Sequence, residues 1–166
     1  MSAILKKHLV AGAIFVSILG TILHFFYQWS GENFIVGLFA PVTESTWEHM
    51  KLLFFPMLLY IIYMSFLFQR NDSLRAALIL AALVGLMMIP TLFFTYSGIL
   101  GFQITAIDIA IFYISIIITF IFAYRLILYG RFHNGAGILT LILLLTAVLF
   151  FVFSVYPPDL GLFRVP

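Results

Sequence analysis

The sequence contains no cysteine and very little charge, and each absence removes a group of functions. Without cysteine the chain has no disulfide, no thiolate metal ligand and no cysteine nucleophile. Only 8% of the 166 residues are charged, whereas about a quarter are charged in a typical soluble domain. Hydrophobic residues make up 64% of the chain, and the mean hydropathy is +1.21. The composition therefore excludes an ordinary soluble domain and indicates a membrane protein.

The few charges give no sign of a nucleic-acid partner. The formal net charge is only +2, although the calculated pI is about 9.0. The cations lie at the ends of apolar runs, where membrane topology requires them, and not in a patch that would follow a phosphate backbone. We therefore expect membrane lipid, and no nucleic acid, as the surroundings of this chain.

Five apolar runs are long enough to cross a membrane, because a helix of about 20 residues spans about 30 Å of hydrocarbon. They predict helices at about 9–27, 44–68, 76–94, 104–124 and 138–156. The second run is short by itself, and residues 44–51 extend it into the interface. The sequence thus predicts an all-α polytopic membrane protein, a bundle of five transmembrane helices that forms a single transmembrane domain over 1–166.

The positions of lysine and arginine predict the orientation, since both residues favour short cytoplasmic loops. A cytoplasmic amino terminus places most of the cations inside, namely Lys6, Lys7, Arg70, Arg75, Arg125 and Arg131. Only Lys51 and Arg164 then lie outside. We therefore expect a multi-pass protein of the cell membrane with a cytoplasmic amino terminus and an extracytoplasmic carboxyl terminus.

This orientation gathers the acids on the external side. Five of the six lie there, namely Glu32, Glu44, Glu48, Asp108 and Asp159. The densest stretch is PVTESTWEHMK, residues 41–51. If it is helical, an advance of about 100° per residue puts Glu44, Glu48 and Lys51 on one stripe. Ser45 and His49 fall on the stripe beside it, and Ser45 with Glu48 has the spacing of a capping box.

Two ionisable residues on the same side lie inside apolar runs. His24 is near the outer end of the first run, and Asp108 is about a turn inside the outer end of the fourth. Such residues are costly within a membrane and mark candidate functional sites. Nitrogen and oxygen ligands without sulfur suit zinc, manganese or iron. The predicted metal ligands are His24, Glu44, Glu48 and His49, and the predicted catalytic residues are Glu48, His49 and Asp108.

Three functions fit these residues. The first is an intramembrane hydrolase or transferase acting on a lipid-like substrate, in which a divalent metal such as zinc lowers the pKa of bound water to about 7. The second is a non-enzymatic binder or transporter of an ion or small molecule, or an accessory subunit of another membrane protein. The third is a structural polar knot whose groups satisfy one another. The simplest interpretation of the stretch itself is a capped helix start in which Glu48 pairs with Lys51.

Two segments also resemble a known group of proteins. ESTWEHMKL, residues 44–52, resembles the signature Asn-Glu-Ser-x-Trp-Glu-His-x-Lys-Leu of an uncharacterised family of small bacterial multi-pass membrane proteins. Thr43 stands where that signature has asparagine. PPDLGLF, residues 157–163, is similar to the family's closing Pro-Pro segment, although this chain ends in FRVP and lacks the acid expected after the phenylalanine. The resemblance implies a shared external site and no established activity.

Overall fold

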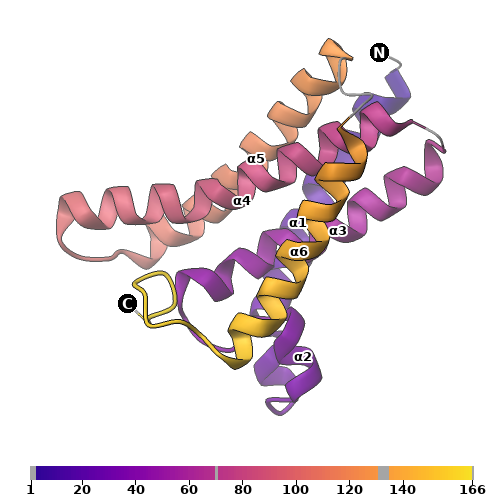
Figure 1. Ribbon diagram of the computed structural model, residues 1–166. Coiled ribbons are helices and arrows are strands. Elements are labelled where there is room, and N and C mark those ends of the chain that lie inside the picture. The colour runs from indigo at the N-terminus through magenta and orange to yellow at the C-terminus, as the bar shows by residue number, and fades with distance from the viewer. Residues whose placement is uncertain (1–2, 70, 131–134, 166) are drawn as a thin grey trace.

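The computed structural model describes residues 3–69, 71–130 and 135–165. Within these residues all regular structure is helical, and no strand occurs (Figure 1). The helices are α1 (Ala3–Trp29), α2 (Phe34–Phe39), α3 (Thr46–Leu67), α4 (Asp72–Leu100), α5 (Thr105–Tyr129) and α6 (Ala136–Val155). All except α2 are long and apolar enough to cross a membrane, which gives the five candidate spans. The predicted fold class, a polytopic helical membrane protein, is confirmed.

The helix ends differ from the predicted ranges in both directions. The helices α1 and α4 extend beyond the predicted 9–27 and 76–94 at both ends, whereas α3 is shorter than the predicted 44–68. Polar residues need not end a helix, and Asp72 in the first turn of α4 is favourable near the positive end of the helix dipole. Arg70 and Arg131, on which the predicted orientation partly rests, lie outside the described residues.

The short helix α2 was not predicted. Asn33 caps it, and its side-chain oxygen accepts from the backbone N–H groups of Ile35 at 2.9 Å and Val36 at 3.4 Å. This cap allows the chain to turn after α1 into one and a half turns of helix before the segment that leads to α3. An apolar run of six residues is too short to span a membrane and carries no topological signal.

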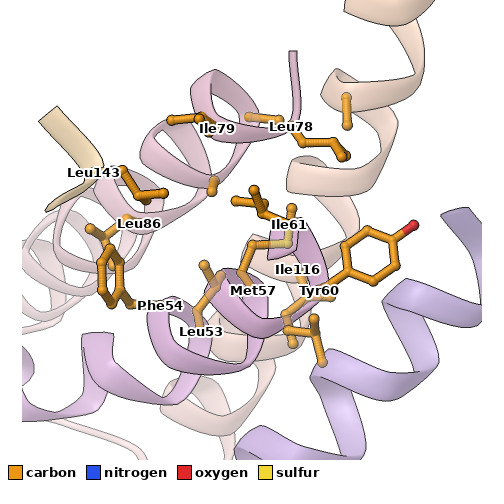
Figure 2. Packing of buried hydrophobic residues seen from close by; sticks show 14 of the residues in the cluster. Leu53, Phe54, Met57, Tyr60, Ile61, Leu78, Ile79, Leu86, Ile116 and Leu143 are labelled. Carbon is orange, nitrogen blue, oxygen red and sulfur yellow. The ribbon is translucent and has the colours of Figure 1, made fainter. Parts of the chain in front are cut away.

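The central helix is α3, which packs against α1, α4 and α6, while α5 lies along α4 and also contacts α1. Figure 2 shows the core where these helices meet, with Leu53, Met57 and Ile61 of α3 near residues of three other helices, namely Leu78, Ile79 and Leu86 of α4, Ile116 of α5 and Leu143 of α6. The outer helices expose large apolar side chains, among them Ile14, Ile117 and Leu144. Exposed side chains of this kind suit a lipid environment.

Two glycines allow close approaches that shape the fold. A Cβ atom on Gly20 of α1 would collide with the Leu52 carbonyl oxygen of α3 and with the ring of Phe112 on α5. A Cβ atom on Gly85 of α4 would collide with Thr119 of α5. Small residues let membrane helices approach closely. Since Gly20 lies one turn before His24, its contact also brings His24 toward the beginning of α3.

Gly85→Ala should loosen the packing of α4 on α5. The added Cβ would lie 3.0 Å from the Cβ of Thr119 and 3.2 Å from the Ser115 carbonyl oxygen. We expect a loss of about 1–3 kcal/mol in unfolding free energy, as for other overpacked cores. Gly98→Ala on the same helix enters open space and should change stability by less than about 1 kcal/mol. Chemical unfolding in mixed micelles compares the two, and equal effects would contradict this account of the helix contact.

Candidate metal centre

The centre is built around the first residues of α3. Ser45 is the N-cap, with φ −69° and ψ 151°, and its side-chain oxygen accepts from the backbone N–H of Glu48 at 3.4 Å. This is one half of the predicted capping box. The other half does not form, because the Glu48 carboxylate accepts from the backbone N–H of Val42. The helix therefore begins at Thr46, and Glu44 precedes it and does not share a helical stripe with Glu48.

His24, Glu44 and His49 come together at this helix start. One ligand atom of each residue lies within 4.8 Å of the ligand atoms of the other two. His24 comes from α1, His49 from the beginning of α3, and Glu44 from the segment before it. The imidazole rings are 5.3 Å apart between centroids and half-buried, whereas Glu44 is exposed. The structure thus brings three of the four predicted metal ligands together.

A hydrogen bond determines which nitrogen of His49 faces the other two residues. Its Nδ1 lies 3.0 Å from the Ser45 carbonyl oxygen, which can only accept, so Nδ1 carries a proton and donates. Its Nε2 lies 3.3 Å from the Glu44 carboxylate. In the neutral imidazole, Nε2 and the carboxylate are both acceptors. A cation between the two groups would be bound by both.

His24 also has an unused polar atom. Its Nδ1 is buried and has no hydrogen-bond partner among the described residues. Buried polar atoms are hydrogen-bonded in the great majority of cases, so this nitrogen is an exception, and it belongs to a residue that lies beside a carboxylate and a second imidazole. Metal-bound histidines are commonly held through their other nitrogen by a carbonyl or carboxylate, as Ser45 holds His49 here.

The three residues lie in the wall of a cavity of about 520 Å³. The cavity is bordered by α1, α3, α4, α5 and the carboxyl-terminal tail, and most of its lining is apolar, including Phe25, Leu52, Ile89, Phe93, Ile109 and Phe112. A structural polar knot would be closed by its own members. Here the polar group opens onto a space large enough for a ligand.

Glu48 is separate from these three residues and forms a buried ion pair with Lys51. Its Oε2 lies 2.7 Å from Lys51 Nζ and also accepts from the Val42 N–H at 2.8 Å. Its Oε1 accepts from the Ser154 hydroxyl of α6 at 2.9 Å. Lys51 Nζ donates further to the carbonyls of Gly37 at 2.8 Å and Ala40 at 3.3 Å. We call this arrangement the Glu48–Lys51 clasp.

The clasp explains why Glu48 does not join the other predicted ligands. Both of its carboxylate oxygens are engaged, and the residue is only 4% exposed. The pairing with Lys51 is the one that the simplest interpretation of the sequence expects. We therefore omit Glu48, predicted as a ligand and as a catalytic residue, from the metal set that we propose.

Asp108 borders the same cavity without joining His24, Glu44 and His49. It lies in the first turn of α5 and accepts a hydrogen bond from the Tyr96 hydroxyl near the end of α4. That hydroxyl accepts in turn from the backbone N–H of Ile104 at 3.2 Å. Nothing in the sequence spacing pairs Tyr96 with Asp108, so this partner was not predicted.

The carboxyl-terminal tail also reaches the centre. The backbone N–H of Trp47 donates to the Leu162 carbonyl at 3.0 Å, and the ring of Phe163 lies 4.9 Å from that of Trp47 between centroids. Val165 contributes to the cavity wall. The tail segment that resembles a family motif and the stretch at 44–52 are therefore neighbours in space.

The fold and the cavity define a multi-pass helical membrane protein with a cluster of two histidines and a glutamate beside an apolar chamber. The chain belongs to the family of unknown function DUF6512, whose model matches residues 1–165. A family of unknown function fits the expectation of an uncharacterised family. No curated protein and no solved structure matches the chain.

Removing one partner of the clasp should be strongly destabilising. Glu48→Gln leaves the Lys51 ammonium buried without its counter-charge, for which we expect a loss of about 3–5 kcal/mol in unfolding free energy. The exposed pair of Asp159 with Arg164 provides the control. Asp159→Asn should cost less than about 1 kcal/mol. Both effects are measured by chemical unfolding in mixed micelles.

The double variant Glu48→Gln with Lys51→Met tests the cause of that loss. It removes the uncompensated charge, so we expect it to be more stable than Glu48→Gln alone. If the two substitutions instead add, or if Glu48→Gln behaves like Asp159→Asn, the pair does not stabilise the fold in the way described.

Proposed function

We propose that this protein binds a divalent metal ion, such as zinc, through His24, Glu44 and His49, and that it is an intramembrane hydrolase or transferase acting on a lipid-like substrate. The observation that carries the proposal is the meeting of three nitrogen and oxygen ligand atoms within 4.8 Å at the wall of a cavity. Two imidazoles and a carboxylate form one of the ligand sets of catalytic zinc sites, which keep a further position open.

Each of the three residues has a distinct part in this proposal. The Ser45 carbonyl fixes the ring of His49, so that Nε2 is the atom available to a cation. Glu44 supplies a negative charge that partly neutralises the ion. His24 reaches the same point because Gly20 allows α1 to approach α3. A bound zinc ion supplies Lewis-acid activation of a carbonyl group or of a water molecule.

The apolar lining supports a lipid-like substrate. Phe25, Leu52, Phe93 and Phe112 present hydrocarbon or aromatic surface to the cavity, which suits an acyl or alkyl chain. Hydrolysis of an ester or amide would form a bond between the water oxygen and the acyl carbon. The bond to the leaving oxygen or nitrogen breaks, and the leaving group takes up a proton.

Metal content tests the proposal most directly. Elemental mass spectrometry on detergent-purified wild type, after loosely bound ions are removed, should give close to one metal ion per chain. His49→Ala and Glu44→Gln should lose most of it, because each removes one of only three protein ligands. His8→Ala serves as the matched control, since His8 lies near the other end of α1, beside Tyr63 and Phe68.

Absence of metal from every preparation, or equal metal in wild type and in folded His49→Ala, would contradict the site. Metal-loaded wild type should also cleave or transfer acyl groups of lipid esters or amides, whereas His49→Ala should not. Stoichiometric metal without any such turnover would contradict the enzymatic part and favour an ion binder.

We further propose that the protein lies in the cell membrane with its amino terminus in the cytoplasm, so that the cavity faces the outer leaflet. The chain has no cysteine, so single introduced thiols can be labelled without background. A membrane-impermeant maleimide applied to intact cells should label Glu32→Cys, which lies in an exposed turn after α1. Gln69→Cys, between α3 and α4, should react only after the membrane is opened. The reverse pattern would invert the orientation.

A further inference from the structure

The cavity contains a second acid, Asp108, whose hydrogen-bonding capacity is only partly used. One of its carboxylate oxygens accepts from the Tyr96 hydroxyl, and that hydroxyl is held by the Ile104 N–H. The structure shows no other hydrogen bond or ion pair to the Asp108 side chain among the described residues. Tyr96 therefore fixes the carboxylate in place, while its second oxygen has no partner in the part of the chain that the structure describes.

Among the residues that the structure describes, no lysine or arginine pairs with Asp108. Among the described residues, the cavity lining includes two carboxylates, Glu44 and Asp108, and two imidazoles, but no lysine and no arginine. A divalent ion held by His24, Glu44 and His49 would keep one positive charge after Glu44 is counted, but Asp108 is not one of the clustered residues and would have no direct contact with it. Because much of the surrounding wall is apolar, water compensates this charge less well than it would at an open surface.

The rest of the lining indicates what kind of cation fits. Phe93, whose ring lies 5.9 Å from that of Tyr96 between centroids, also lines the cavity, and aromatic rings can attract ammonium groups. Ile109 and Ile111 follow Asp108 along α5 and supply apolar wall. The lining therefore combines an anionic anchor with a surface for a hydrocarbon chain. Among the described residues, the lining contains no lysine or arginine that could bind an anionic head group.

We propose that Asp108, held by Tyr96, binds the ammonium head group of a single-chain amphiphile whose hydrocarbon chain lies along the apolar wall. Such an amphiphile would be the substrate class of the proposed enzyme. The inference rests on the proposed function only in placing that amphiphile beside the metal ligands. Binding of the amine itself requires the cavity and the Asp108 charge, and needs no metal.

Binding of radiolabelled dodecylamine to chelator-treated protein in neutral-lipid nanodiscs tests the inference, with empty nanodiscs as the blank. Wild type should bind the amine saturably, and dodecanol and dodecyl sulfate should compete poorly. Asp108→Asn keeps the shape of the side chain but removes its charge, so we expect affinity to fall about tenfold or more. Tyr96→Phe keeps the charge but frees the carboxylate, so its loss should be smaller.

The matched control is Asp72→Asn. Asp72 is likewise an acid in the first turn of a helix, but it pairs with Arg75 and does not line the cavity. Its substitution should leave amine binding unchanged. Equal amine affinity in wild type and Asp108→Asn would overturn the inference.

Competition on the wild type alone provides a second test, which does not depend on whether Asp108→Asn folds. If dodecanol competes as well as the amine, the cavity does not select a cation and the inference is wrong. Because the amine binding is measured on chelator-treated protein, a positive result would remain valid even if the metal proposal proved wrong. Conversely, a metal site can be present in a protein that does not bind the amine, so the two failures are distinguishable.

Discussion

The fold depends on how the chain satisfies one buried ammonium group. Lys51 is 0% exposed, and its Nζ donates to the Gly37 and Ala40 carbonyls and to the Glu48 carboxylate. An ammonium has three donors, and all three find an oxygen here. Burial of an unpaired ammonium costs several kcal/mol, so this arrangement of acceptors is strongly specified. It connects α2 and the segment after it to α3.

The same interaction also orders the metal centre without being part of it. Glu48 accepts from the N–H of Val42, two residues before Glu44, and from the hydroxyl of Ser154 on α6. The segment that presents Glu44 is therefore fixed between the clasp and the Ser45 cap. Two glutamates four residues apart have different tasks because the helix begins between them. Glu48 lies on the helix and is buried, whereas Glu44 precedes it and faces His49.

Much of this fold follows from the sequence, because only helices satisfy their own backbone groups in hydrocarbon. The five spans, and the gathering of His24 and His49 at one end of the bundle, follow from run lengths and turn positions. The different roles of Glu44 and Glu48 do not follow from the sequence. The predicted helix began at residue 44, which placed both glutamates on one helical stripe. The partners Ser154 and Tyr96 were also beyond prediction. Each is joined to its acid by helix packing, over 106 and 12 residues of sequence respectively.

In an apolar protein, the polar groups that best indicate a ligand site are those whose capacity for hydrogen bonds or ion pairs is not used within the protein. The oxygens of Glu48 and the donors of Lys51 are all engaged, so the clasp has no capacity for a ligand. His24 Nδ1, the facing pair of His49 and Glu44, and one oxygen of Asp108 retain such capacity, and all four residues border the same cavity. Trp47 Nε1, Arg75 Nε and Ser115 Oγ also lack partners among the described residues, but none of these three residues lines that space. Unused capacity in low-dielectric surroundings is unfavourable. The presence of four such residues at one chamber therefore favours a ligand site over a structural role for them.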